Sequence, residues 1–294
     1  MRLFITGGAG FIGTHLCNKL ISNHDVTIYD NFSNSNQQNF LSRASDKIKI
    51  VSGDILDYSK LVSAMKNHEV VIHLAAKIDV IDSINNPDDT FQTNVTGTQN
   101  VLDSCNSHNI QKFIVTSSSA IYQNSNTMVS ESSNAEPSSP YGQSKLDMEK
   151  IIISSNLNYS ILRLFNVYGD GSTGGVISNF TKNISENKPL TIFGDGKAVR
   201  DFVHIDDVID GIVLCMNFKS GIYNIASGVG TSIADLASLF VRSSEDKITY
   251  KPARMGEITY SVADIIKSQK ELGFFPKTSL NDGLKSIMFN YSKN

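Results

Sequence analysis

The sequence predicts an α/β fold, a doubly wound parallel sheet followed by a smaller α/β lobe. Short β-branched runs alternate with helix-like segments up to Gly169, which is the order of strands joined by crossover helices. These runs are almost wholly apolar, as expected for strands that are buried on both faces of a sheet. After Gly169 a glycine-rich loop interrupts the alternation, and this change predicts the start of the second lobe.

The elements can be placed along the chain. In the first lobe, strands are expected in the runs RLFITG, DVTIYD, IKIVSGD, VVIHLAA, KFIVTSS and YSILRLFNVYG, and helices over 11–22, 57–67, 94–108 and 138–153. In the second lobe, strands are expected at both ends of PLTIFGDGKAVRDFVH and in GIYNIAS and KITYKP, with helices over 205–215, 233–242 and from residue 279. We therefore expect one domain at 1–166, which also receives 198–218, and a second lobe at 167–294.

Composition excludes several classes of protein. The chain has 294 residues and a net charge of −3, so nucleic acid or an anionic membrane is not its expected partner. No apolar run approaches the ~20 residues that would span a membrane. Three separated cysteines without a C-x-x-C motif predict reduced thiols in a cytoplasmic protein. The histidines form no metal-binding motif, so no metal is expected.

A glycine-rich segment, TGGAGFIG, joins the first strand to the first helix. Gly7, Gly10 and Gly13 suit a tight turn, close approach of the backbone to a pyrophosphate, and close packing of helix on sheet, as in Rossmann-type folds. Asp30 closes the second strand, where a carboxylate accepts hydrogen bonds from an adenine ribose and repels a 2′-phosphate, which favours NAD over NADP. A plain tight turn and a strand-ending acid are the alternative interpretations. Asp54 is either an adenine contact or an ordinary loop acid.

Tyr141 and Lys145 are four residues apart, so a helix would place them on one face. Ser139 and Pro140 suit the N-cap and first position of that helix. A tyrosine acting as a base near pH 7 needs its pKa lowered by roughly 3 units, of which a lysine ammonium about 6 Å away supplies about 2. Ser118 ends the fifth strand at its carboxyl end, where a hydroxyl can exchange a proton with Tyr141. Alternatively, the pair lies on an exposed face and the serine satisfies a turn.

With these features in place, the chain resembles the extended short-chain dehydrogenase/reductases, and among them the UDP-glucose 4-epimerase group. The resemblance runs nearly end to end. Its motifs are TGGAGFIG (Thr6–Gly13), DNF (Asp30–Phe32), GDI (Gly53–Ile55), HLAA (His73–Ala76), TNVTGT (Thr93–Thr98), TSSSAIY (Thr116–Tyr122), YGQSK (Tyr141–Lys145), LRLFNVYG (Leu162–Gly169), FGDGKAVRDFVHIDDV (Phe193–Val208), YNIASG (Tyr223–Gly228) and PARMGE (Pro252–Glu257).

The resemblance implies a permanently held NAD and a UDP-sugar whose C4 is inverted through a transient 4-keto sugar. By matching position it implies Ser118, Tyr141 and Lys145 as the catalytic set. The cofactor would be bound by Gly7, Gly10, Phe11, Ile12, Gly13, Asp30, Asn31, Asp54, Ile55, Leu74, Ala75, Ala76, Asn94, Ser117, Tyr141 and Lys145. The nucleotide sugar would be bound by Ser118, Asn166, Val176, Arg200, Arg254 and Glu257; guanidinium groups suit a diphosphate because they are planar and always charged.

Other activities share these motifs. A nucleotide-sugar 4,6-dehydratase or a UDP-glucuronate decarboxylase usually carries acidic residues directly after the serine position, where this chain has Ser119 and Ala120. A UDP-glucuronate epimerase remains an alternative, and so does a non-catalytic NAD-sensing scaffold protein, although such a sensor has no need of Tyr141 and Lys145.

The chain also departs from the family pattern. Gln123 replaces a common glycine, and Ser261, at the expected gatekeeper position, would leave room for an N-acetylated sugar. The family implies a homodimer through the segments Asp88–His108 and Tyr141–Ser155.

Overall fold

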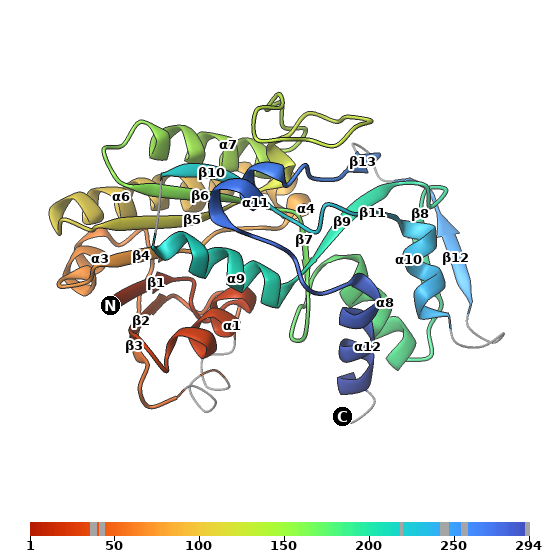
Figure 1. Cartoon of the computed structure of the whole chain (residues 1–294), viewed down its shortest axis with the longest axis horizontal. Coiled ribbons are helices and arrows are strands. Elements are labelled where there is room, and N and C mark those ends of the chain that lie inside the picture. Colours follow the sequence, from red (N-terminus) through yellow and green to blue (C-terminus); the bar gives the residue numbers. More distant parts are fainter. Residues whose placement is uncertain (36–39, 41–44, 218–219, 242–246, 254–257, 292–294) are drawn as a thin grey trace. The chain divides into compact units, whose positions relative to one another are not determined.

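A computed structural model describes residues 1–35, 40, 45–217, 220–241, 247–253 and 258–291 (Figure 1). The chain divides into two compact units. The first unit contains Met1–Tyr122, Ala135–Arg163 and Ile212–Tyr223, and the second contains Gln123–Asn134, Leu164–Gly211 and Asn224–Asn294. The predicted division of the chain into domains, 1–166 with 198–218 and 167–294, remains a proposal.

The first unit is built on a seven-stranded sheet with the strand order β10-β6-β5-β4-β1-β2-β3 (Figure 1). The pairs β1–β2, β1–β4, β2–β3 and β4–β5 are parallel. The strands are β1 (Arg2–Thr6), β2 (Asp25–Asp30), β3 (Lys49–Ser52), β4 (Val70–His73), β5 (Lys112–Ser118), β6 (Tyr159–Leu164) and β10 (Gly221–Ile225). This confirms the predicted Rossmann-type α/β class. The order reverses between β1 and β4, and ligands of such sheets bind at the carboxyl ends of the strands beside that point.

The helical segments that follow these strands carry six of the predicted site residues, Phe11, Ile12, Gly13, Asn94, Tyr141 and Lys145. These segments are α1 (Phe11–Leu20), α3 (Tyr58–Met65), α4 (Val80–Asn85), α5 (Pro87–Phe91), the π-helical turn η1 (Gln92–Thr96), α6 (Gly97–Ser107), the 3₁₀ turn η2 (Ser119–Ile121) and α7 (Pro140–Ile153). The core packs side chains of the sheet, including Phe4, Val71 and Phe113, against Leu61, Val101 and Met148 of the helices. This packing fixes where α6 and α7 begin relative to the carboxyl ends of β4 and β5.

The second unit has its own sheets and core. Its elements are β7 (Asn166–Tyr168), α8 (Gly175–Ser185), β8 (Leu190–Phe193), β9 (Val199–His204), α9 (Ile205–Met216, which continues into the first unit), β11 (Gly230–Ser232), α10 (Ile233–Phe240), β12 (Ile248–Lys251), β13 (Tyr260–Ser261), α11 (Ile266–Leu272) and α12 (Leu280–Tyr291). Strand β9 pairs with β7, β11 and β13, while β8 pairs with β12. The core lies among Phe180, Leu190, Leu236, Phe240 and neighbouring apolar side chains.

Three of the expected elements differ in the structure. The run YSILRLFNVYG was expected as one strand but forms two, because the chain leaves the seven-stranded sheet after Leu164 and β7 pairs with β9 instead. The strand in GIYNIAS was assigned to the second lobe, yet β10 is an edge strand of the seven-stranded sheet. The helix expected over 94–108 begins as the π-helical turn η1 and becomes α-helical only at Gly97.

Candidate active site

The turn between β1 and α1 is shaped by two glycines. Gly7 has φ of 69°, and a Cβ atom there would lie 2.5 Å from the Ala75 nitrogen, so the turn packs directly on the loop after β4. A Cβ atom at Gly13 would lie 2.5 Å from the Gly7 carbonyl oxygen, so α1 packs equally closely on the turn. Only glycine fits either approach without a shift of the backbone. These are the turn and packing roles that the sequence predicted for the glycine motif.

The N-terminus of α1 is available to an anion. Gly10 is the N-cap residue and supplies no side-chain hydrogen bond, and the first turn contains no acidic residue. Phe11 and Ile12, the first two helical residues, are half-buried. A helix N-terminus presents backbone N–H groups and a partial positive charge, so this end of α1 has the donor set that a pyrophosphate requires.

Polar side chains lie at the ends of β2 and β3. The Asp30 carboxylate accepts hydrogen bonds from the backbone N–H groups of Ala9, at 2.9 Å, and Phe32, at 2.7 Å. Asn31 donates from Nδ2 to the Asp54 carboxylate at 2.8 Å. The glycine turn thus holds Asp30 in place, and each of its oxygens keeps a second lone pair for another donor.

The remaining predicted cofactor residues of these loops differ in exposure. Leu74, Ala75 and Ala76 are half-buried directly after β4, beside the glycine turn. Ile55 is 5% exposed and its side chain belongs to the core, packed against Gly97 at the start of α6. The structure therefore leaves only the main chain of Ile55 for a ligand contact.

Ser118 and Tyr141 meet at the carboxyl end of β5. Their hydroxyl groups are hydrogen-bonded to each other, and the Ala120 N–H donates to the Ser118 Oγ at 3.1 Å. A Cβ atom at Gly142 would lie 2.3 Å from the Ala120 carbonyl oxygen, so the first turn of α7 packs closely on η2. This packing brings the predicted serine and tyrosine together.

Burial dominates the electrostatics of Tyr141 and Lys145. The Lys145 Nζ donates to the Thr116 carbonyl at 3.0 Å, and burial lowers the pKa of this amine to about 8, although Glu149 opposes the shift. Burial raises the pKa of Tyr141, and the hydrogen bond from Ser118 lowers it. The four-residue spacing predicts that the Lys145 ammonium lowers this pKa. In the structure, the hydrogen bond to Ser118 is the interaction that does so.

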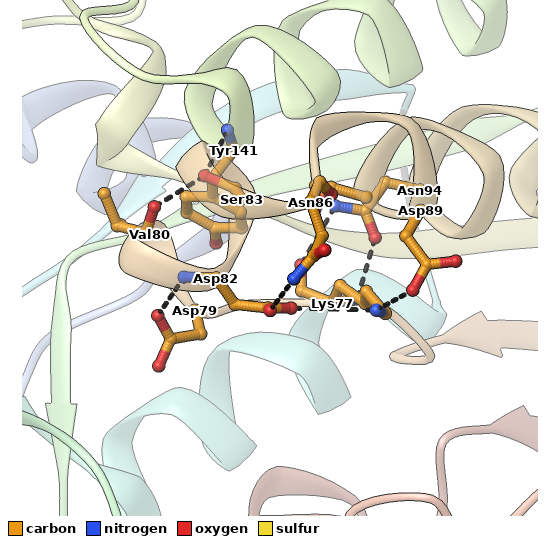
Figure 2. Close-up of polar contacts among 10 residues, drawn as sticks. Lys77, Asp79, Val80, Asp82, Ser83, Asn86, Asp89, Asn94 and Tyr141 are labelled. Carbon is orange, nitrogen blue, oxygen red and sulfur yellow. Dashed lines mark hydrogen bonds and ion pairs between the residues drawn. The ribbon is translucent and has the colours of Figure 1, made fainter.

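Two further predicted residues have different surroundings. Ser117 is 4% exposed, and within the described part of the chain its Oγ has no hydrogen-bond partner. Asn94 is 1% exposed and donates to the Ser144 Oγ at 2.9 Å. It also donates to the Lys77 carbonyl at 2.9 Å and accepts from the Lys77 N–H at 2.8 Å (Figure 2). Both amide hydrogens of Asn94 are therefore used within the protein, and it links the loop after β4 to α7.

Sequence reasoning missed Ser83 and Ser144, which contact the main chain of Tyr141. Ser144 donates to the Tyr141 carbonyl at 2.7 Å, and Ser83 accepts from the Tyr141 N–H at 3.1 Å. No motif marks Ser83, because α4 itself was not predicted and its apolar residues Ile81 and Ile84 are each 59% exposed. The available signal was Asp79, whose side chain caps α4 by accepting from the Asp82 N–H.

Three of the predicted substrate-binding residues lie in the second unit. Asn166 begins β7 and donates to the Asp201 carbonyl at 3.1 Å, while Arg200 lies on β9 opposite Ser261 of β13. Asn166 pairs with Phe202 of β9, which lies two residues after Arg200 on that strand. Val176 is half-buried in the first turn of α8. The predicted substrate residues Arg254 and Glu257 lie outside the described residues.

The residues of the first unit fit NAD. The glycine turn permits close approach, the N-terminus of α1 has the donors for a pyrophosphate, and Asp30 keeps acceptor capacity for a ribose. The buried Ser117 hydroxyl, which has no hydrogen-bond partner among the described residues, suits a polar ligand atom near the Ser118–Tyr141 pair.

Comparison with known proteins agrees with this geometry. The chain is 37% identical to a putative UDP-glucose 4-epimerase of Methanocaldococcus jannaschii over 99% of this chain and 98% of that protein. It is 31% identical to a UDP-glucose 4-epimerase of Yersinia pestis, over 100% and 98% of the two chains.

Solved structures show the same agreement. The UDP-glucose 4-epimerase of Thermotoga maritima with UDP-glucose superposes with a TM-score of 0.93 at 32% identity, over 100% of this chain and 99% of that one. A dTDP-glucose 4,6-dehydratase of Streptomyces venezuelae with bound NAD has a TM-score of 0.94 at 29% identity, over 100% and 98%. The sequence profile of the NAD dependent epimerase/dehydratase family matches residues 3–226, and this chain belongs to that family.

Proposed function

We propose that this protein is an NAD-dependent epimerase that inverts C4 of a UDP-hexose, either UDP-glucose/UDP-galactose or their N-acetylated forms. The observation that carries the proposal is the hydrogen-bonded pair of Ser118 and Tyr141, with Lys145 one helical turn further on. The similar proteins named UDP-glucose 4-epimerase support the same activity.

The catalytic roles follow from proton transfer. Tyr141 is the group that takes the proton of the 4′-hydroxyl and later returns one, and Ser118 bridges the sugar oxygen and the phenol. Because burial raises the pKa of Tyr141, nearby positive charge is needed to stabilise the phenolate. Lys145 is the protein's own cation on that face of α7, and its amine is held against the Thr116 carbonyl.

NAD would be held by the glycine turn, the first turn of α1, Asp30, Asn31 and Asp54, and the residues after β4 and β5. When bound, NAD supplies reversible oxidation at the sugar C4. Asn166, Val176, Arg200, Arg254 and Glu257 are proposed to hold the nucleotide diphosphate and the uridine ribose.

A dehydratase is the nearest alternative activity, since one shares this fold with a TM-score of 0.94. A 4,6-dehydratase must remove the C5 proton and protonate the C6 hydroxyl, which calls for an added acid and base beside the sugar. The residues that directly follow Ser118, Ser119 and Ala120, carry no carboxyl group. This favours epimerisation over dehydration or decarboxylation.

A panel of UDP-sugars tests the proposal. The NAD-loaded protein is incubated with UDP-galactose, UDP-N-acetylgalactosamine, UDP-glucuronate and dTDP-glucose, and the products are identified by NMR. Inversion at C4 of a UDP-hexose is the expected result. A 4-keto-6-deoxy sugar, a pentose, or inversion of UDP-glucuronate alone would each establish one of the alternatives, and no turnover at all would favour the NAD-sensing scaffold.

Replacement of Tyr141 separates chemistry from binding. Tyr141→Phe keeps the ring but removes the proton-accepting oxygen, so kcat should fall at least about 1,000-fold while NAD remains bound. Retained turnover in this variant would contradict the assignment of the base.

A homodimer and a cytoplasmic location are further proposals. The dimer is assigned to 88–108 and 141–155, which include most of α5, η1, α6 and α7, and sedimentation measures it directly. The cytoplasmic location is supported by Cys17, Cys105 and Cys215, which are buried free thiols. Among the described residues, no helix combines the length and apolar character that crossing a membrane would require.

A further inference from the structure

The first turn of α7 uses almost every hydrogen-bond donor that a helix start leaves unpaired. Ser139 is the N-cap residue, and its side chain accepts from the Gly142 N–H at 3.1 Å. Pro140 has no N–H group to satisfy. The N–H group of Tyr141 remains, and because Tyr141 is only 8% exposed, water is a poor substitute for a protein acceptor.

Ser83 supplies this acceptor from another helix. The Tyr141 N–H donates to the Ser83 Oγ at 3.1 Å, and the Ser83 hydroxyl donates to the Val80 carbonyl at 2.7 Å (Figure 2). Ser83 is fully buried and is the only buried residue of α4, a helix that lies wholly within the described residues. Its hydroxyl proton points to Val80, so its lone pairs face the Tyr141 amide.

We propose that Ser83 is a positioning residue for Tyr141, which holds the tyrosine backbone at the place where its hydroxyl meets Ser118. This rests on the proposed function, in which Tyr141 is the base. A side chain that fixes the main chain of the base controls the geometry of proton transfer without touching the sugar. Displacement of a reacting group by about 1 Å costs on the order of 100-fold in rate.

The decisive comparison uses two isosteric variants. Ser83→Thr keeps the hydroxyl, which can still donate to the carbonyl three residues earlier, whereas Ser83→Val has the same shape and no hydroxyl. Ser83→Val and Ser83→Ala should lower kcat about 10- to 100-fold with KM and bound NAD unchanged, and Ser83→Thr should retain most of kcat. Ser104→Ala is the matched control, because Ser104 is also fully buried but donates only to Asn100 of its own helix.

The pH profile distinguishes positioning from a general loss of stability. The charged and titratable groups around Tyr141 and Lys145 include His73 on β4, Glu149 on α7 and Arg163 on β6. None of them is altered in these variants. Since the hydrogen bond from Ser118 lowers the pKa of Tyr141, its weakening in Ser83→Val should move the rising limb of kcat to higher pH. Ser104→Ala should leave that limb in place.

Amide hydrogen exchange provides a readout that does not depend on turnover. In the NAD-loaded protein, the Tyr141 amide should exchange faster in Ser83→Val than in Ser83→Thr. Equal kcat and equal exchange in the Thr and Val variants would overturn the proposal. If the wild-type protein converts no UDP-sugar, the proposed function fails. The exchange rates of the Tyr141 amide in Ser83→Thr and Ser83→Val still decide whether Ser83 holds this backbone.

Discussion

The guanidinium of Arg163 and the carboxylate of Glu149 form an ion pair inside the first unit, with 2.8 Å between Nη2 and Oε2. The Arg163 Nε also donates to the same carboxylate, and Nη1 donates to the Tyr122 hydroxyl at 3.0 Å. The two side chains are only 7% and 1% exposed. Glu149 lies four residues after Lys145, which lies four after Tyr141, so the pair underlies the face of α7 that carries the proposed catalytic residues.

Removal of one partner of this pair should destabilise the protein strongly. Glu149→Gln keeps the shape of the side chain but leaves the buried guanidinium without its counter-charge, which costs about 3–5 kcal/mol in comparable pairs. Urea unfolding measures the loss. The control is Asp147→Asn on the same helix, because Asp147 pairs with Lys150 at the surface, where the two side chains are 31% and 61% exposed. That variant should lose no more than about 1 kcal/mol. Equal losses in the two variants would contradict the prediction.

His73 should make the stability of the protein sensitive to acid. Its ring is buried between the hydroxyls of Thr6 and Thr98, and burial, with a contribution from Lys145, lowers its pKa to about 3. An unfolded histidine has a pKa of about 6.5, so below that pH the unfolded chain binds a proton that the folded chain does not. Stability is therefore lost as the pH falls from about 6.5 towards 3.

The measurement compares unfolding free energies at pH 7 and pH 5. One proton over this interval corresponds to about 2 kcal/mol of lost stability from His73. His73→Asn, which does not titrate, should be less stable than the wild type at both pH values. Between pH 7 and pH 5, however, its unfolding free energy should fall by about 2 kcal/mol less than that of the wild type. If the wild-type and variant proteins have parallel pH dependences, His73 is not the group responsible.

Gly13 provides a case in which propensity and packing predict opposite results. Alanine is the better helix former by about 1 kcal/mol, so propensity alone predicts that Gly13→Ala stabilises α1. However, its Cβ atom would lie 2.5 Å from the Gly7 carbonyl oxygen, which is backbone and cannot rotate away. We expect α1 to move off the glycine turn, with loss of co-purifying NAD read from absorbance after denaturation. Gly174→Ala is the control, because no atom of the described residues lies within 4 Å of its Cβ position. Normal NAD content in Gly13→Ala would contradict the expectation.

The sequence predicted the first unit well because its signals are local. A buried parallel strand is a short apolar run, and the glycine motif must follow the first strand to serve its purpose, so both can be recognised without knowing the fold. The meeting of Ser118 and Tyr141 could be predicted because Ser118 ends a recognisable strand and Tyr141 lies at the start of a recognisable helix. Their meeting also depends on the parallel sheet that the alternating pattern predicts, because ligands of such sheets bind at the carboxyl ends of the strands.

The features that could not be predicted depend on tertiary contacts. β10 joins the seven-stranded sheet although its sequence resembles that of any half-buried strand, and the break after Leu164 has no glycine or proline to mark it. Ser83 acts through its hydroxyl on the amide of a residue 58 positions away, and no local pattern encodes that distance. The pKa of Tyr141 likewise depends on burial, which a helix pattern alone does not determine.

The three consecutive serines at the carboxyl end of β5, Ser117 to Ser119, give the sharpest test of the proposed site. Only Ser118 is hydrogen-bonded to the Tyr141 hydroxyl, and this bond lowers the pKa of Tyr141. Ser118→Ala should therefore reduce kcat about 100-fold or more and shift its rising limb to higher pH, because a tyrosine with a higher pKa ionises later. Ser119→Ala removes a neighbouring hydroxyl from η2 and should keep both the rate and the profile of the wild type. Steady-state kinetics with UDP-galactose between pH 6 and pH 10 separate the two. If Ser119→Ala matches Ser118→Ala, or if Ser118→Ala keeps the wild-type rate, the hydroxyl that serves the sugar is not Ser118.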